Sequence, residues 1–178
     1  IVSVLADRYG VSIADVSTGD YYVTEVDSER KLFDEITKFS PSEIICNESF
    51  YMSGVDIEDL RHRLKITIYA LETWYFGDEL AETTLLTHFK VKSLEALGLA
   101  DYDCGMIAAG ALLKYLYETQ KNDLNNISVI HPYSTGKYMI IDSSTRRNLE
   151  LVETLREKQK RGSLLWVLDK TKTAMGAR

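Results

Sequence analysis

The sequence predicts a mixed α/β domain followed by a mostly helical segment of a second, truncated domain. Three observations predict this arrangement. Strand-like runs fill residues 1–26, helical and strand-like runs alternate from there to about residue 130, and a polar, turn-rich stretch covers residues 131–137. Such a stretch is typical of a connection between domains. We therefore expect one domain at residues 1–136 and the beginning of another at residues 137–178.

Three antiparallel strands are expected at the start of the chain. The runs at residues 1–6, 9–16 and 21–26 are rich in apolar, aromatic and β-branched side chains. Residues 17–20, Ser-Thr-Gly-Asp, have the composition of a hairpin turn in which Gly19 can take a positive φ. Because the connections are short, the three runs are predicted to form an antiparallel meander.

The rest of the first domain alternates between helices and strands. Asp27 or Ser28 can cap a helix that ends at Ser40-Pro41, since proline disfavours helical structure in the residue before it. Further strands are expected at 43–46 and 66–71, helices at 56–64, 79–89 (capped by Asp78), 93–99 and from Asp101 or Asp103 to about Lys121, and a strand or extended connection at 127–130. A meander followed by alternating helices and strands is the order of an RNase H-like mixed sheet.

The C-terminal segment is predicted to be helical and poorly covered. Asp142 or Ser143 can cap a helix from about Thr145 to Lys160, with a stripe of apolar residues, and Gly162 ends it. The stripe consists of Leu149, Val152 and Leu155. Residues 164–168 are apolar on almost every side, so we expect them to be buried against other elements. The remaining chain is too short to provide those elements. We expect this end to be loose, to pack back on the first domain or to self-associate, and both chain ends to be cuts within a longer protein.

Charge and composition exclude several classes of protein. The net charge of −6 divides into −11 over residues 1–142 and +5 over residues 143–178. The acidic part repels a phosphate backbone, so we expect at most weak, non-specific DNA binding. The two cysteines are expected to be reduced and buried, and the scattered histidines form no zinc pattern. No apolar run approaches the roughly 20 residues that a membrane span requires.

The predicted topology raises the alternative of a divergent RNase H-like, metal-dependent nuclease. Two-metal nucleases need carboxylates that converge on paired cations. The first strand has no carboxylate before Asp7 at its end, and Asp15 lies beside the hairpin turn, where a turn-stabilising role is the simpler interpretation. A glycine-rich phosphate loop is also missing from the sequence. We therefore predict no catalytic residues, no metal site and no cofactor in this chain, and keep the nuclease as the alternative.

Two sequence blocks near the C-terminus resemble a known family. Residues 145–150 read Thr-Arg-Arg-Asn-Leu-Glu, and residues 168–178 read Leu-Asp-Lys-Thr-Lys-Thr-Ala-Met-Gly-Ala-Arg. In this order, the blocks resemble the opening of the core domain of bacterial MutS mismatch-repair proteins. Residues 14–19, Ala-Asp-Val-Ser-Thr-Gly, resemble a strand and turn of the MutS connector domain. The spacing of Trp74 and Phe76 before the 79–89 helix is similar but less specific.

The resemblance implies that the chain is a module of a larger protein. It implies that the first domain is a connector that docks MutL and transmits signals, and that the second is the start of the core domain, which leads to the lever helices. The parent would bind mismatched DNA as a dimer with a second MutS subunit, use ATP and magnesium, and work in the bacterial cytosol near the nucleoid. The family's Phe-x-Glu mismatch reader is matched only by Phe33-Asp34-Glu35, which lies in the wrong domain and is interpreted as helix composition.

The helix at residues 79–89 is the predicted MutL contact. Its buried stripe is Ala81, Leu85 and Phe89, and helical geometry turns other side chains away from that stripe. The predicted contact residues are Glu82, Thr83, Thr84 and Thr87, with Thr84 nearest the border of the stripe. Adjacent threonines weaken an exposed helix, which hints at a surface function, although a tolerated solvent face or a pure spacer would explain them too. Arg146 and Arg147 are expected to form ion pairs within the core rather than to contact DNA.

Overall fold

The computed structural model of the chain describes residues 2–5, 8–62, 64–120, 124–137, 141–173 and 176. The chain divides into two compact units, residues 1–137 and residues 138–178. Among the described residues, no helix combines the length and the apolar character needed to cross a membrane.

The first unit is built on a mixed sheet with the strand order β5-β4-β1-β2-β3-β6. Its strands are β1 (Val2–Leu5), β2 (Arg8–Asp15), β3 (Asp20–Val26), β4 (Glu43–Cys46), β5 (Thr67–Ala70) and β6 (His131–Pro132). The first three are antiparallel neighbours, whereas β4 is parallel to β1, β5 to β4 and β6 to β3. The predicted meander and mixed α/β class are confirmed.

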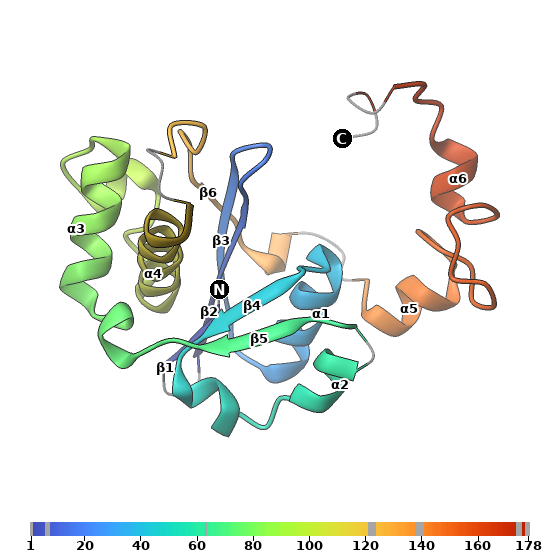
Figure 1. Cartoon of the computed structure of the whole chain (residues 1–178), viewed down its shortest axis with the longest axis horizontal. Helices are drawn as coiled ribbons and strands as arrows, with labels where there is room; N and C mark the ends of the chain where they lie inside the picture. Colours follow the sequence, from blue (N-terminus) through green and yellow to red (C-terminus); the bar gives the residue numbers. More distant parts are fainter. Residues whose placement is uncertain are drawn as a thin grey trace. The chain divides into compact units, whose positions relative to one another are not determined.

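The helices of this unit alternate with the later strands (Figure 1). They are α1 (Glu29–Phe39), α2 (Ile57–His62), α3 (Asp78–Phe89) and α4 (Asp103–Gln120), with 3-10 turns η1 (Glu48–Met52), η2 (Thr73–Phe76), η3 (Leu94–Leu97) and η4 (Thr135–Lys137). The side chain of Ser28 caps α1, and Ser40 ends it in a left-handed conformation just before Pro41. Both ends of α1 therefore lie where the sequence predicted them.

Both faces of the sheet are covered, and each face has its own apolar core (Figure 1). Alternate residues of β2 and β3 point to opposite faces. Val11 and Val26 pack with Leu32 of α1 and Leu60 of α2 on one face. On the other face, Tyr21 and Val23 pack with side chains of α3 and α4, among them Leu85, Leu112 and Leu113.

Helix α4 approaches its neighbours too closely for larger side chains. A Cβ placed on Gly10 of β2 would lie 2.0 Å from the carbonyl oxygen of Cys104, and one on Gly110 would lie 2.3 Å from the Cα of Ala81 in α3. Contacts this short are not tolerated in proteins. The two glycines therefore let α4 pack directly on the sheet and let α3 pack directly on α4.

Two local predictions differ from the structure. Gly77, rather than Asp78, occupies the cap position of α3, and it has no side-chain cap. Residues 127–130 form a connection with no helix or strand, which is one of the two predicted alternatives, whereas pairing with β3 begins at His131, which had been placed in the boundary segment. Pro132 is accepted in β6 because an edge strand has one side on which no N–H is needed. The predicted final helical residue Lys121 lies outside the described residues.

The second unit is less helical than predicted. Helix α5 spans Ser143–Asn148 and α6 spans Leu164–Leu168, so the expected helix from Thr145 to Lys160 is wrong. Glu150 takes a left-handed φ of 48°, and the carbonyls of Glu150 and Leu151 accept hydrogen bonds from Leu164 and Leu165. The chain therefore folds back on itself. The predicted apolar stripe is exposed, and an uncovered stripe adds little stability to a helix.

Candidate docking surface

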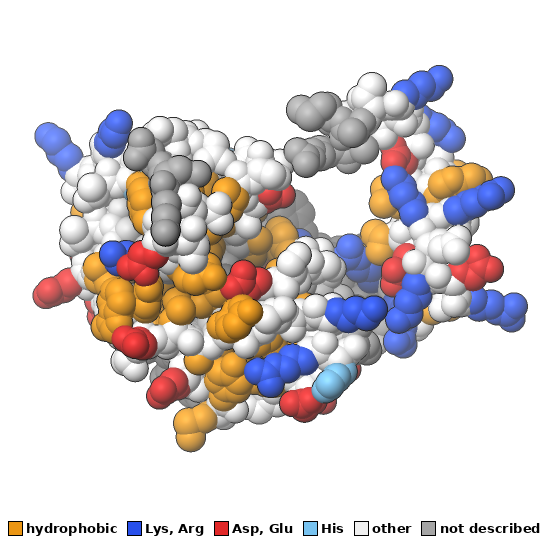
Figure 2. Space-filling view, in the orientation of Figure 1, with side chains coloured by type: hydrophobic (Ala, Val, Ile, Leu, Met, Phe, Trp, Pro, Cys, Tyr) orange, Lys and Arg blue, Asp and Glu red, His pale blue; other side chains and the backbone are white. Residues whose placement is uncertain are grey.

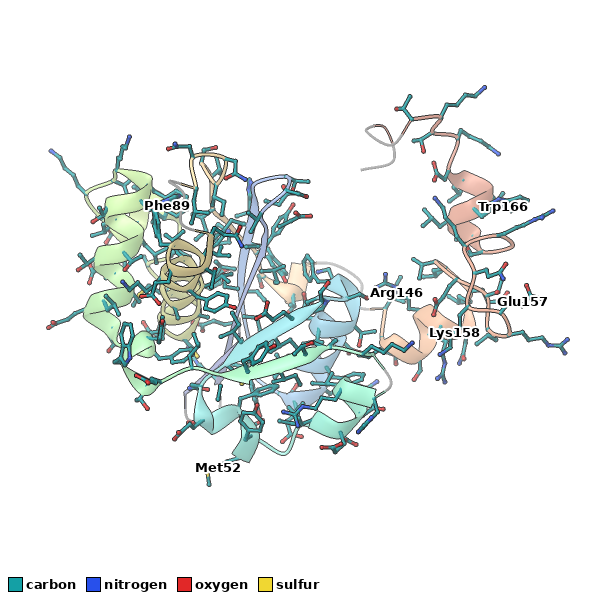
Figure 3. All side chains as sticks on the ribbon, in the orientation of Figure 1. Met52, Phe89, Arg146, Glu157, Lys158 and Trp166 are labelled. Atoms are coloured by element: carbon teal, nitrogen blue, oxygen red, sulfur yellow. The ribbon has the colours of Figure 1, made fainter. Side chains whose placement is uncertain are left out.

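Helix α3 presents one face to the interior and the opposite face to solvent. Ala81 and Leu85 are fully buried against α4 and the sheet. Phe89, one turn further on α3 (Figure 3), is half-buried. Its ring lies edge-on to Tyr21 of β3 with 6.3 Å between ring centroids. The predicted stripe is therefore the face that anchors α3.

The C-terminal end of α3 is held by His88. Its Nδ1 lies 2.5 Å from the Tyr117 hydroxyl of α4, and its Nε2 lies 2.7 Å from the Ile127 carbonyl oxygen. A carbonyl can only accept a hydrogen bond, so Nε2 donates to the Ile127 carbonyl, and Nδ1 shares a hydrogen bond with the Tyr117 hydroxyl. His88 thereby joins α3, α4 and the connection that leads to β6. The sequence gives no local signal for this role, because Tyr117 and Ile127 lie far from His88 along the chain.

The N-terminal end of α3 is held through the preceding turn. Trp74 and Tyr75 of η2 stack with 3.9 Å between ring centroids, and the Tyr75 hydroxyl donates to the Glu118 carboxylate of α4. This hydrogen bond raises the pKa of Tyr75 to about 12 and lowers that of Glu118. Both ends of α3 are thus fastened to α4, which fixes the position of its outer face.

The predicted contact residues lie on that outer face. Glu82, Thr83 and Thr87 are exposed, whereas Thr84 is half-buried. The Thr84 hydroxyl donates to the Leu80 carbonyl oxygen at 2.6 Å, one turn earlier in the helix. The orientation predicted for these four side chains is confirmed, including the border position of Thr84. Their part in binding MutL stays a prediction.

The charge on and around α3 is asymmetric. Asp78, Glu79 and Glu82 are exposed in its N-terminal half, and Lys90 and Lys92 are exposed just beyond its C-terminus. The hydroxyls of the exposed threonines lie between these two charged regions. Such a surface offers hydrogen bonds and complementary charges to a protein partner, and complementary charge chiefly affects specificity and the association rate.

The carboxylate of Asp15 is engaged in the hairpin turn. Its Oδ1 accepts hydrogen bonds from the Ser17 amide at 2.8 Å and the Ser17 hydroxyl at 2.6 Å. The turn-stabilising interpretation of Asp15 is therefore correct. Within the ranges that the structure describes, no group of three or more His, Cys, Asp or Glu side chains is placed to hold a metal ion.

Other reactive side chains have structural surroundings. Cys46 and Cys104 are free and buried, and burial raises the pKa of Cys46 to about 11. A thiol that is harder to ionise is a poor nucleophile. Glu35, the last residue of the Phe-x-Glu match, is buried in α1 and accepts a hydrogen bond from the Tyr133 hydroxyl at 2.6 Å. The match is therefore part of the interior packing of this unit.

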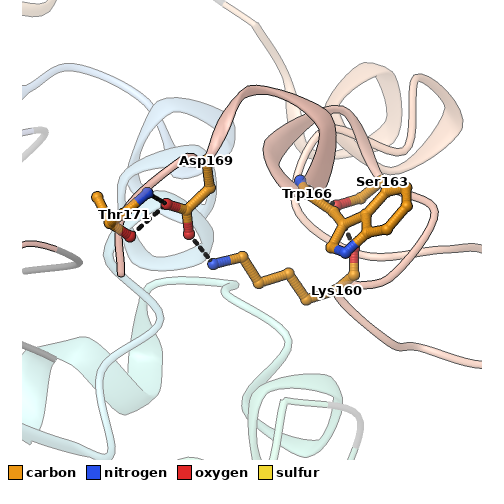
Figure 4. A network of polar contacts seen from close by, with 5 residues as sticks. All are labelled: Lys160, Ser163, Trp166, Asp169 and Thr171. Atoms are coloured by element: carbon orange, nitrogen blue, oxygen red, sulfur yellow. Dashed lines mark hydrogen bonds and ion pairs between the residues drawn. The ribbon is translucent and has the colours of Figure 1, made fainter. Parts of the chain in front are cut away.

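The second unit carries basic side chains and a local polar network. Lys and Arg side chains are prominent on its visible face (Figure 2). The Lys160 ammonium pairs with the Asp169 carboxylate, which also accepts from the Thr171 amide at 3.0 Å (Figure 4). These contacts, the bond to Lys160 first, hold the pKa of Asp169 well below its usual range. Arg147 is exposed and Arg146 is half-buried, so neither is enclosed in a core here.

Comparison with known proteins identifies both units. Residues 1–128 match the family model of MutS domain II, and residues 144–178 match that of MutS domain III. The chain is 63% identical over 172 residues to the DNA mismatch repair protein MutS of Lachnoclostridium phytofermentans, covering 97% of this chain and 18% of that protein. It is 43% identical over 173 residues to the protein of the same name from Ruminiclostridium cellulolyticum, covering 96% of this chain and 20% of the relative.

The matches define the class of protein as a two-unit portion of a DNA mismatch-repair protein. The chain belongs to the MutS family. It spans about a fifth of the length of the relatives that it matches. The residues of this chain can therefore account only for properties of MutS domains II and III.

Proposed function

We propose that residues 1–136 are the MutS connector and that residues 137–178 open the core domain. In this proposal the connector docks MutL and passes signals between the DNA-binding and ATPase parts of the whole protein. The observation that supports the docking proposal is the structure of the outer face of α3. Its exposed polar residues stand on a helix that Ala81, Leu85, His88 and Tyr75 hold rigidly to α4. A fixed helix keeps a docking surface preorganised, which reduces the entropy lost on binding.

We also infer an RNase H-like topology without the nuclease chemistry. The order β5-β4-β1-β2-β3, with β4 and β5 parallel to β1, supports the topology. The engaged Asp15 carboxylate supports a non-catalytic role, since fold alone does not determine function. ATP and magnesium would then act in a part of the parent protein other than these two units.

The remaining partners belong to the whole protein in this proposal. Mismatched DNA and a second MutS subunit would be bound mainly by other domains, in the bacterial cytosol and near the nucleoid. The acidic charge of residues 1–142 supports this division, because it opposes direct contact with a phosphate backbone. The basic second unit would lie among the lever helices of the core.

The docking proposal is tested by placing a bulky charge on the outer face of α3. Thr83→Arg and Thr84→Arg are made in the whole MutS protein, and recruitment of MutL to mismatched DNA is measured. Each variant is expected to abolish recruitment, because the arginine is a steric obstacle that also loses hydration on docking. Folding should change by only about 0.5 kcal/mol for exposed Thr83, as is usual for surface substitutions. Thr84 additionally loses the hydroxyl bond to Leu80.

Ser49→Arg provides a matched control, since Ser49 is exposed on η1, away from α3 in the chain. It should recruit MutL normally. Normal recruitment by both α3 variants, with folding and DNA binding intact, would move the docking surface elsewhere. A loss of recruitment by all three variants would indicate a general defect instead of a contact on α3.

A further inference from the structure

Exposed aromatic side chains gather where the edge strand β5 leads into η2. Tyr69 of β5 is 53% exposed and Trp74 of η2 is 48% exposed. Ile68 belongs to the core on the α1 face, so by alternation Tyr69 points to the opposite face, on which α4 lies. Figure 2 shows hydrophobic and acidic side chains side by side around η2 and β5. The aromatic–acidic surface is defined as Tyr69, Glu72, Trp74, Tyr75 and Glu118.

Two rings of this surface are joined to carboxylates. The Trp74 Nε1–H donates to the Glu72 carboxylate at 2.7 Å, and the Tyr75 hydroxyl donates to the Glu118 carboxylate. The hydrogen bond to Glu118 is the main cause that raises the pKa of Tyr75 to about 12, and the nearby charge of Glu72 adds to it. Two negative charges therefore lie beside two stacked rings, and the faces of such rings also attract cations.

The negative charge of the aromatic–acidic surface is only partly neutralised. The Lys114 ammonium lies 3.2 Å from the Glu118 carboxylate. Glu72 is exposed and has no ion pair within the described part of the chain. Its carboxylate can accept further hydrogen bonds in addition to the one from Trp74. Glu72 is therefore the position at which the surface is complementary to a cation.

The arrangement suits the guanidinium of arginine better than the ammonium of lysine. The rings of Trp74 and Tyr75 stack on each other, so the exposed area of Trp74 includes its opposite face. A planar guanidinium can stack on that face and donate N–H groups to Glu72 at the edge of the indole, whereas an ammonium is a point charge. Arginine, tryptophan and tyrosine are also the residues that most often dominate the energy of protein interfaces.

The charge of the first unit favours a protein segment over a nucleic acid or an anionic membrane. Residues 1–142 carry a net negative charge, whose field repels phosphate groups. The first unit of a second copy would be repelled for the same reason. A basic segment of another protein is attracted by this field and supplies the cation that Glu72 complements.

We propose that the aromatic–acidic surface binds an arginine in an exposed basic segment of a partner protein. The guanidinium stacks on Trp74 and pairs with Glu72, and Tyr69 contacts apolar groups of the same segment. This surface is formed by β5, η2 and α4, and the outer face of α3 is not part of it. The proposal therefore stands or fails independently of MutL docking on α3.

Short peptides of the sequence Gly-Ser-X-Ser-Gly test the proposal, with arginine, lysine or citrulline as X. Citrulline keeps the planar shape of arginine but has no charge. Each peptide is titrated at low salt into the 178-residue chain, and the Trp74 Nε1–H resonance is followed by NMR. The arginine peptide should give a saturable shift, the lysine peptide should bind more weakly, and the citrulline peptide should not bind. Equal responses to arginine and citrulline would overturn the proposal.

Two charge-removing variants localise the binding. Glu72→Gln keeps an oxygen that accepts from Trp74 and removes the charge, so it should raise the Kd of the arginine peptide about threefold, as expected for one exposed ion pair. Glu95→Gln is the matched control, because it removes the charge of an exposed glutamate on η3. It should leave the Kd unchanged. An equal change in both variants would reduce the effect to general charge attraction and overturn the site.

The whole MutS protein provides the final test. Saturation-transfer NMR on the arginine peptide is compared between the unaltered protein and its Glu72→Gln variant, and the signal should be weaker in the variant. Absence of binding to the whole protein would show that another part of it covers the surface, which overturns the proposal. A Trp74 shift that grows with the concentration of the 178-residue chain, without peptide, would assign the surface to a second copy and overturn it too.

Discussion

The two units of this chain use apolar residues in opposite ways. Among the described residues, every buried hydrophobic side chain lies between Val2 and Ile130 in the first unit. In the described part of the second unit, Ser163 is the one buried residue, and all five residues of α6 are exposed by 41% or more. Similar leucine-rich segments thus form a core in one unit and an uncovered surface in the other.

The difference shows which interactions maintain each unit. The first has helices on both faces of a sheet, so burial stabilises its elements. The second depends on local hydrogen bonds. The Asp142 side chain caps α5, the Ser163 side chain caps α6, and the pair of Lys160 and Asp169 links the residues just before and just after α6. Local bonds can set a backbone conformation, but each contributes only about 0.5–1.5 kcal/mol.

The comparison is tested most strongly by removing one leucine from each unit. Leu113→Ala removes a fully buried side chain of α4 and should lower the free energy of unfolding by about 2–5 kcal/mol. Leu165→Ala, at a residue that is 41% exposed, should change it by only about 0.5 kcal/mol. Urea unfolding followed by circular dichroism measures both. Equal losses would contradict the division into a packed unit and an uncovered one.

A smaller effect is expected from Ser163→Ala. The Ser163 hydroxyl accepts from the Trp166 amide at 3.2 Å and donates to the Lys160 carbonyl at 2.7 Å. Loss of an N-cap costs about 0.5–2 kcal/mol of stability. Helix α6 has only five residues, so few other interactions within the helix can compensate for the lost cap. The Trp166 amide should exchange several-fold faster in the variant, while amides of α4 are unchanged. Ser163→Thr, which keeps a hydroxyl that can both accept from Trp166 and donate to Lys160, should restore most of the protection. Unchanged exchange at Trp166 in Ser163→Ala would show that the cap is dispensable.

The sequence predicted the first unit well because its signals are local and its helices find partners. The caps of α1, the Gly19 turn and the bounds of β4 follow from residue types within one or two turns of the chain. The outward direction of Glu82, Thr83 and Thr87 follows from helical periodicity once Ala81 and Leu85 are buried. Periodicity could not reveal His88 as an anchor, because Tyr117 and Ile127 are distant in sequence.

The second unit shows where periodicity misleads. Leu149, Val152 and Leu155 repeat at helical spacing, but the chain turns at Glu150 and all three are exposed. A helical pattern predicts a helix only if another element covers its stripe, and that information is not local.

The smallest effect is expected from removing the second unit entirely. A chain that ends at Lys137 keeps all the buried hydrophobic side chains found among the described residues. Its free energy of unfolding should therefore differ from that of the full chain by only about 0.5 kcal/mol, the usual range for changes outside a core. Trp74 is its single tryptophan, because Trp166 is removed, so fluorescence then reports the first unit alone. The control is a chain ending at Ile127, which also removes Ile130 and β6 and should be clearly less stable. Unfolding of the chain that ends at Lys137 would mean that residues 138–178 are integral to the α/β unit.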